Sequence, residues 1–285
     1  MNKLLLGTLT AALCACGGSG TKNDAGQDAG EQPVVFTVTG RVTTYPPARP
    51  FLADAGMSDF PVAGLLARVE EPLKVALGQA AGIFGQTVLS DAGTISVSGI
   101  SSDEVSLGVG IGVLDPSDAG APRVIRAATG VWDVALEASK PRGDILNQVA
   151  YAVPTGFHDL LTEAIGRSTI AGITSVGSKN TLIKAGFLLG RIVDAQGKPV
   201  AGATIKSTPS SYDAQFFYPK ADYSGVQAQT DSNGMFVFVH NGGTVQPFRF
   251  DVTGRPEYRQ RNAGAAADAC LVLTVYPGTT APPAE

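Results

Sequence analysis

The chain has 285 residues, a formal net charge of −4, and 21 Lys and Arg residues against 25 Asp and Glu residues. The sequence has no basic patch, so we expect no nucleic acid partner. The length allows one large or two ordinary domains, and 35 Gly and 18 Pro residues indicate many turns.

The first fifteen residues have the pattern of a secretory signal. Lys3 gives a positive start, and Leu4–Ala15 is a run of apolar or small residues. The run is shorter than the roughly twenty residues that a helix needs to cross a bilayer. A charged start before a short apolar run is typical of a secretory signal peptide. We therefore expect residues 1–15 to be a signal peptide.

The end of this signal resembles the bacterial lipoprotein box. In Leu13-Cys14-Ala15-Cys16, a Leu lies three residues before Cys16 and a small residue lies directly before it. The resemblance implies that Cys16 is the lipidated first mature residue, anchored in the membrane by acyl chains such as palmitate. Cys14 fits the role poorly because bulky Leu13 precedes it. A metal site needs more ligands than these two cysteines, so the alternative is an ordinary signal peptide that contains Cys.

The segment after the lipid site is expected to be a disordered tether, residues 16–32. Gly17–Gln32 contains no aromatic residue and no β-branched aliphatic residue, so it cannot form a core. In the sorting pattern of enteric bacterial lipoproteins, an Asp directly after the lipidated Cys is an inner-membrane signal. This chain has Gly17 at that position, so the resemblance favours the outer membrane. The tail, residues 279–285, is also expected to be disordered.

Hydrophobic alternation with a period of two dominates the rest of the chain, and it predicts an all-β fold. One predicted strand face is formed by Phe36, Val38, Gly40 and Val42. Other faces of this kind are Val105, Leu107, Val109, Ile111 and Val113; Phe248, Phe250 and Val252; and Leu271, Leu273 and Val275. Trp132 is predicted to be a core residue, and Cys270 a buried thiol.

Two parts of the chain repeat the same motifs in the same order, which predicts two copies of one β-module. Each copy has Gly-Arg-Val or Gly-Arg-Ile, then Pro-Val-Ala-Gly, then a turn with Asp and Gly before an alternating strand. The first copy is Val38–Val42, Pro61–Val69 and Leu89–Ile100, and the second is Leu188–Ile192, Pro199–Ser207 and Gln229–Asn241.

The second copy resembles the carboxypeptidase regulatory-like domain over about residues 186–277. The resemblance rests on GRIVDAQGKPVAGATIKS and TDSNGMFVF, and it implies a transthyretin-like Greek-key β-sandwich with an accessory role and no catalytic residue. We therefore predict two tandem transthyretin-like β-sandwiches, a divergent one at residues 33–138 and a second at residues 186–278. Some relatives have a carbohydrate-binding-like fold, which is an analogy of fold alone.

A connector, residues 139–185, is expected between the two sandwiches. In Pro154–Gly166 the apolar residues recur at helical spacing, which predicts a short amphipathic helix. We expect Thr155 to cap its start and Gly166 to end it. Its polar face carries Asp159 and Glu163, so we expect it to pack on a sandwich and not on a membrane.

The sequence offers few candidates for chemistry. His158 and His240 are the two histidines, and neither has a nucleophile motif or a second ligand at metal-binding spacing. We expect no catalytic residue, no metal site and no cofactor. The candidate ligand-contact loop contains five rings, and the alternative is that these rings fold over the edge of the sandwich. The rings are Tyr212, Phe216, Phe217, Tyr218 and Tyr223.

These features together predict a lipid-anchored, non-catalytic envelope protein that presents β-sandwich modules for structural or adhesive interaction. The partners expected are the membrane, through the lipid anchor, and a protein or polysaccharide. One alternative is a carbohydrate-binding accessory lipoprotein that uses the loop of five rings. A second alternative is a non-catalytic subunit of an envelope enzyme complex.

Overall fold

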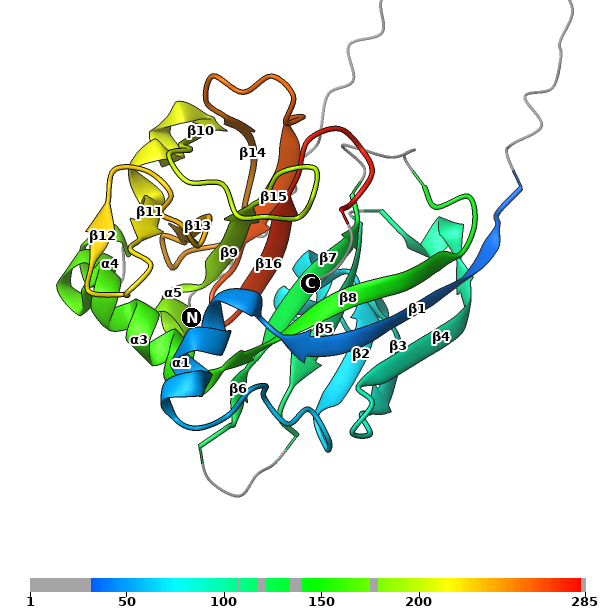
Figure 1. The fold of residues 1–285 in the computed structure, drawn as a ribbon. Helices are drawn as coiled ribbons and strands as arrows, with labels where there is room; N and C mark the ends of the chain where they lie inside the picture. The colour runs from blue at the N-terminus through cyan, green and yellow to red at the C-terminus, as the bar shows by residue number, and fades with distance from the viewer. Residues whose placement is uncertain (1–31, 107, 117–120, 134–139, 175–178, 283–285) are drawn as a thin grey trace, which may run out of the picture. The chain divides into compact units, whose positions relative to one another are not determined.

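The computed structural model describes residues 32–106, 108–116, 121–133, 140–174 and 179–282 (Figure 1). Residues 33–285 form one compact unit. The first half of the chain gives the strands β1 (Val35–Thr44), β2 (Leu66–Glu70), β3 (Ile83–Val88), β4 (Thr94–Ser101), β5 (Val109–Leu114), β6 (Val124–Ile125), β7 (Ala127–Trp132) and β8 (Ile145–Pro154). The second half gives β9 (Phe187–Ile192), β10 (Ile205–Thr208), β11 (Phe216–Pro219), β12 (Val226–Gln227), β13 (Met235–Val239), β14 (Gln246–Val252), β15 (Arg261–Ala265) and β16 (Cys270–Val275).

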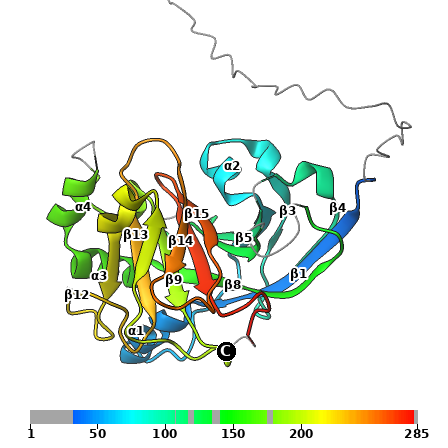
Figure 2. The same cartoon turned by 90° about the horizontal axis from the view of Figure 1, so that it is seen from above.

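Five short α-helices accompany these strands in the described part of the chain. They are α1 (Arg49–Asp54), α2 (Pro72–Ala76), α3 (Thr155–Ile165), α4 (Arg167–Ile173) and α5 (Leu182–Ala185). The predicted all-β class, with several sheets and short connecting helices, is therefore confirmed. Figure 2 shows α3 and α4 on one side of the molecule and β3 and β4 on the opposite side.

The strands form three sheets, with the orders β4-β1-β8-β6, β10-β14-β15 and β12-β11-β13-β9-β16-β7-β5-β2-β3. In the first sandwich, the sheet of β1 packs on the part of the nine-stranded sheet formed by β2, β5 and β7. Phe36, Val69, Ile111 and Trp132 lie in this core, so the core position of Trp132 is confirmed. In the second sandwich, β10-β14-β15 packs on β9, β11, β13 and β16, and this core is rich in Phe.

A third apolar cluster covers the other face of β9, β13 and β16 with α3, α4 and α5. Helix α3 agrees with the predicted amphipathic helix: Phe157 and Leu161 are buried, and the side chains of Asp159 and Glu163 are exposed. Gly166, with φ of 93°, ends the helix as predicted. The predicted Thr155 cap is wrong, because the Thr155 hydroxyl donates to the carbonyl oxygen of Pro122 at 2.5 Å. The sequence did not predict α4 and α5.

The two repeat copies have the same strand connections. Strand β1 pairs antiparallel with β4 and parallel with β8, and in the second copy β9 pairs in the same way with β13 and β16. The series β2-β5-β7 of the first copy corresponds to β10-β14-β15 of the second, and all these pairs are antiparallel. The repeated motifs therefore occupy equivalent strands.

Matched backbone hydrogen bonds explain the repeated turn glycines. The Val42 N–H donates to the Gly93 carbonyl at 2.8 Å, and the Ile192 N–H donates to the Gly234 carbonyl at 2.8 Å. Gly93 and Gly234 have φ of 64° and 67°. A Cβ atom would lie 2.6 Å from the Val42 oxygen at the first and 2.5 Å from the Ile192 oxygen at the second. Only glycine fits both the positive φ and this close approach.

Gly202 of the Pro-Val-Ala-Gly motif is explained by its backbone conformation and not by a lack of space. A Cβ at Gly202 would meet only a Gln229 side-chain nitrogen at 3.8 Å, so space is not limiting. Its φ of 73° explains the glycine, and the equivalent Gly64 has φ of 78°.

The junction between the sandwiches is a feature that the repeat alone does not predict. Strand β16 of the second copy pairs in parallel with β9 at six positions and with β7 of the first copy at three, from Cys270↔Ala127 to Val272↔Thr129. One sheet therefore runs through both halves of the molecule (Figure 1). The predicted boundaries at residues 138 and 186 stay a prediction about the repeat copies.

This shared sheet predicts that both halves unfold together. Trp132, the single Trp, reports on the first sandwich, and Cys270 of β16, which is buried in the cluster beneath α3, α4 and α5, reports on the second half of the chain. In a chain with Cys14 and Cys16 replaced by Ser, we expect Trp132 fluorescence and Cys270 thiol reactivity to change at the same urea concentration. Two transitions separated by about 1 M urea or more would show that the halves are independent.

Candidate functional site

The five rings of the predicted ligand-contact loop lie on two different faces of the nine-stranded sheet. Phe216, Phe217 and Tyr218 belong to strand β11, not to a loop. Phe216 and Tyr218 are buried in the core of the second sandwich, and Tyr212 packs against that core. The structure therefore does not gather the five rings on one surface, and ligand contact by them stays a prediction.

Tyr212, Phe216 and Tyr218 stabilise the second sandwich. The Phe216 ring centroid is 5.0 Å from that of Phe238, and the Tyr212 centroid is 6.1 Å from that of Phe248. The Tyr218 hydroxyl accepts a hydrogen bond from the Ile205 N–H at 2.7 Å. Burial raises the pKa of Tyr218.

Tyr223 and Phe217 face the cluster of helices. The Tyr223 hydroxyl donates to the Pro47 carbonyl at 2.5 Å, and its ring stands edge-on to Phe157 at 5.2 Å. Burial raises the pKa of Tyr223 to about 12. Its φ is 57°, an uncommon value for a non-glycine residue. Since Pro47 belongs to the first half of the chain, Tyr223 ties the two halves together.

Both histidines have hydrogen-bond partners inside the fold. The Nδ1 atom of His158 is 2.9 Å from an Asp159 carboxylate oxygen, and its Nε2 accepts from the Ile183 N–H at 3.1 Å. Burial lowers the pKa of His158, although Asp159 acts in the opposite direction. His240 lies 2.9 Å from the Ala185 carbonyl through Nδ1 and 2.6 Å from the Thr244 carbonyl through Nε2. These contacts give both rings a structural role.

Two adjacent buried glutamates are the other candidates for chemistry. Glu71 accepts a hydrogen bond from the Ser106 N–H at 2.5 Å and forms an ion pair with Lys74. Glu70 lies 3.9 Å from the Arg126 guanidinium, and its Oε2 has no hydrogen-bond partner. The two side chains thus contact different residues. Within the described ranges, no three His, Cys, Asp or Glu side chains group as a metal site.

The burial of Glu70 predicts that the stability of the protein depends on pH. Burial raises the pKa of Glu70 above its ordinary value of 4.5. Below pH 4.5 the Glu70 carboxyl is protonated in both the folded and the unfolded protein, and its contribution to stability is greatest. As the pH rises toward the pKa of Glu70 in the folded protein, the carboxyl ionises first in the unfolded protein, so the unfolding free energy falls. We expect the unfolding free energy of Glu70→Gln to lack this decline with rising pH. Urea unfolding between pH 4 and pH 8 measures the unfolding free energy, and Glu163→Gln, at an exposed position, is the control. Equal slopes of unfolding free energy against pH in wild type and Glu70→Gln would contradict the prediction.

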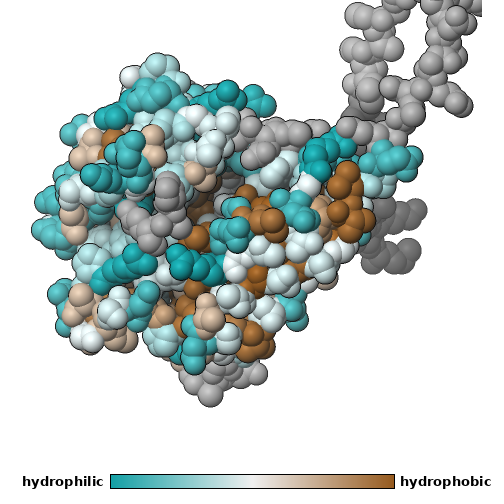
Figure 3. All heavy atoms as spheres, turned by 45° about the vertical axis from the view of Figure 1, so that its right-hand side comes forward, coloured by the Kyte–Doolittle hydropathy of each residue, from teal (hydrophilic) through white to brown (hydrophobic). Residues whose placement is uncertain are grey.

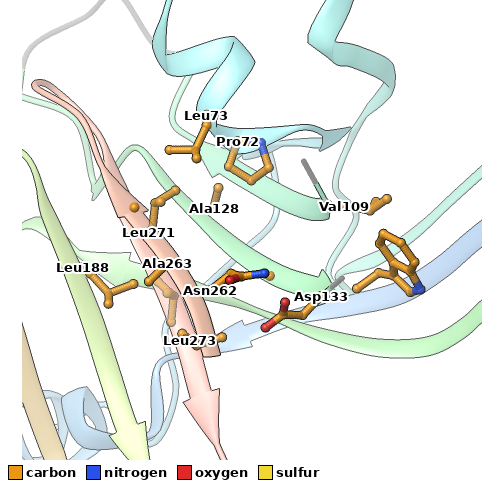
Figure 4. Close-up of a pocket in the computed structure, with 15 residues that line it drawn as sticks. Pro72, Leu73, Val109, Ala128, Asp133, Leu188, Asn262, Ala263, Leu271 and Leu273 are labelled. Carbon is orange, nitrogen blue, oxygen red and sulfur yellow. The ribbon is translucent and has the colours of Figure 1, made fainter. Parts of the chain in front are cut away.

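The junction between the sandwiches has a hollow on one face, the apolar groove (Figure 4). Ala128, Leu271 and Leu273 form its floor, Pro72 and Leu73 of α2 form one wall, and Ala263 of β15 lies opposite. Gly264 lies so close to α2 that an added Cβ would be 3.1 Å from the Leu73 methyl groups. Helix α2 therefore already covers part of the edge of β15.

A second hollow, the arginine cleft, opens where β7 and β16 separate. These strands pair only as far as Thr129 and Val272, and the residues beyond them line a cavity of about 390 Å³. The lining side chains of the cleft come from both halves of the chain and include two arginines, one aspartate and two tyrosines. They are Arg191, Arg261, Asp133, Tyr151 and Tyr276.

Arg261 is held rigidly at the cleft, at the start of β15. It is 4% exposed, its Nε donates to an Asp133 oxygen at 2.9 Å, and its guanidinium lies 5.2 Å from the centre of the Tyr276 ring. Its Nη1 is buried and has no hydrogen-bond partner. Arg191, from the Gly-Arg-Ile motif of β9, is 8% exposed, whereas the equivalent Arg41 of β1 is exposed. Residues of β7 and β8, from the first half of the chain, line the same cleft as Arg191.

Neither the cleft nor the groove was predicted from the sequence. The repeat does contain one signal, because it places an Arg at the same strand position in both copies. The rest depends on the pairing of β7 with β16, which brings Asp133 and Arg261 together across 128 residues.

The lipidation site at Cys16 lies outside the described residues. Among the residues that are described, no helix is both long and apolar enough to span a membrane. Exposed large apolar side chains include Val35, Val88 and Leu146. Figure 3 shows apolar residues scattered among hydrophilic ones over the half formed by the first sandwich.

No protein-family model matches the chain, and no curated protein matches it. Among solved structures, a double mutant of the shaft pilin from Lactobacillus rhamnosus GG is 12% identical over 88% of this chain and 100% of its own, with a TM-score of 0.22. The streptococcal ancillary pilin is 9% identical over 86% of this chain and 69% of its own, also with a TM-score of 0.22.

The TIE protein of Bacillus anthracis is 10% identical over 85% of this chain, with a TM-score of 0.22. This chain covers 34% of the length of that protein. TM-scores at this level do not establish a shared fold. The all-β architecture rests on the strands and registers of the chain itself.

Proposed function

We propose that the chain is a lipid-anchored protein of a bacterial envelope that presents two joined β-sandwiches for structural or adhesive contact and performs no catalysis of its own. The observation that carries the proposal is the nine-stranded sheet shared by both sandwiches. A sheet that continues through β16 couples the two halves by backbone hydrogen bonds, where a flexible linker would leave them free to move.

Several contacts support a rigid module of this kind. Tyr223 bonds to Pro47 across the two halves, and Arg261 bonds to Asp133. Together with the β7–β16 pairing, they hold the sandwiches at more than one point. A rigid body tethered by residues 16–32 would present its surfaces beyond the membrane without changing shape.

The turn geometry of the second copy supports its resemblance to the carboxypeptidase regulatory-like domain. Gly197 has φ of 84°, and the Asp194 carboxylate accepts from the Gln196 and Lys198 N–H groups at 2.9 Å. Asn233 accepts from the Met235 N–H at 3.0 Å. Both turns lie within the two motifs on which the resemblance rests. We propose on this basis that residues 186–278 form a module of that type with an accessory role.

Metabolic labelling with palmitate tests the anchor. We expect label on the wild-type chain and on Cys14→Ser, and none on Cys16→Ser, because the thiol of residue 16 receives the acyl group. Cell fractionation should then release Cys16→Ser from the membrane while Cys14→Ser stays bound. Label that persists on Cys16→Ser would contradict the lipidation site.

The adhesive role is tested by comparing cells that carry the wild-type chain with cells that carry none. We expect loss of attachment to a surface or loss of envelope integrity, restored by the wild-type chain but not by Cys16→Ser. Complete restoration by the released Cys16→Ser chain would contradict a role that depends on the anchor.

A further inference from the structure

We propose that the arginine cleft binds a uronic acid residue of an acidic polysaccharide, with the sugar carboxylate at Arg261. This inference rests on the proposed function, since it names the class of partner that a non-catalytic envelope module would hold. The cleft lies at the junction of the sandwiches, and none of the five rings considered as a ligand-contact loop lines it.

The buried guanidinium of Arg261 is the first observation. Its Nη1 is buried with no hydrogen-bond partner, although a donor in such a position costs free energy until it is paired. Its Nε bond to Asp133 and its stacking on Tyr276 fix the direction of the group. A carboxylate is the planar acceptor that complements a guanidinium held in this way.

The charge of the lining is the second observation. The charged side chains that line the cleft, among the described residues, are Arg191, Arg261 and Asp133. Arg261 keeps one guanidinium nitrogen without a partner although it is bonded to Asp133, so a further anionic oxygen acceptor suits it. A sugar carboxylate is such an acceptor.

The neutral groups around the arginines favour a sugar over a simple carboxylate. Asn147, Gln148 and Thr274 line the cleft with amide and hydroxyl groups that can bond to sugar hydroxyls. Tyr151 and Tyr276 are half-buried and offer ring surface. Asn147 has φ of 57°, an uncommon backbone conformation of the kind that clusters at binding sites. The cavity, about 390 Å³, is within the range of small-molecule sites.

Titration calorimetry with galacturonate, galactose and acetate tests the proposal on the folded chain, and Trp132, which also lines the cleft, provides a fluorescence signal. We expect galacturonate to bind at least about tenfold more tightly than either galactose or acetate. Arg261→Gln should lower the affinity for galacturonate by about tenfold to a hundredfold, which is the effect expected for the loss of one charge-assisted hydrogen bond. Arg41→Gln, at the equivalent exposed position of the first copy, should leave binding unchanged.

A second variant covers the case in which Arg261→Gln does not fold. Gln148→Ala removes a half-exposed amide at the cleft. We expect it to lower the affinity for galacturonate several-fold without changing the urea unfolding midpoint. If galactose bound as tightly as galacturonate, the assignment of a carboxylate would be overturned. If acetate bound as tightly as galacturonate, the assignment of a sugar would be overturned. Absence of galacturonate binding by a chain that is still labelled with palmitate would overturn the inference alone and leave the anchored module in place.

Discussion

Replacing Gly186 by Ala is expected to destabilise the protein by about 4 kcal/mol or more, enough to unfold many domains. Gly186 ends α5 and leads into β9 with φ of 88°. A Cβ at this position would lie 1.9 Å from the Ala266 carbonyl oxygen, a backbone atom. The Gly186 carbonyl also accepts from the His240 N–H at 2.9 Å, so the segment cannot shift without losing that bond.

Gly172→Ala is the matched control, since α4 has open space around this residue. In a helix, Ala is favoured over Gly by about 0.5–1 kcal/mol, so this variant should be slightly more stable than wild type. Urea unfolding followed by Trp132 fluorescence measures both variants. A midpoint of Gly186→Ala within experimental error of the wild type would show that β9 does not need this approach to Ala266.

The repeat allowed much of the local structure to be predicted. Strand faces such as Phe248, Phe250 and Val252 are buried as the alternation predicts, and the helical spacing of Phe157 and Leu161 located α3. These features depend on residues close in sequence, where a period of two or 3.6 is visible directly. Turn glycines such as Gly234 were predictable for the same reason.

The junction could not be predicted in this way, because strand order is set by contacts distant in sequence. Nothing in the alternation of β7 indicates that Ala127 faces Cys270. One signal was present: in Cys270–Val275 apolar residues continue on both faces, which is typical of a strand with both faces buried in a parallel arrangement. The same holds for β9, where every residue is buried.

The candidate site shows the same division between local and distant information. Aromatic clustering around Phe216 suggested an exposed loop, but Phe216 and Tyr218 alternate with Phe217 and so have the period of a strand. The arginine cleft depends on Asp133 and Arg261, which lie in different halves of the chain and meet only after β7 and β16 have paired.

The pairing itself predicts the second large effect, that of Val272→Pro. Val272 is buried and lies opposite Leu189 of β9 on one side and Thr129 of β7 on the other. Proline removes an N–H group from the centre of a sheet and fixes φ, which costs about 3 kcal/mol or more. Because β16 lies between the halves, we expect the loss to reach both sandwiches.

The measurement follows each half separately in the chain with Ser at positions 14 and 16. In Val272→Pro we expect a red-shifted Trp132 emission and a reactive Cys270 thiol under conditions in which wild type protects both. Val88→Pro, at the exposed end of edge strand β3, should retain both signals, since edge strands tolerate proline. Native Trp132 emission beside a reactive Cys270 would mean that the first sandwich is stable without β16. In that case the shared sheet would not be what makes the module rigid.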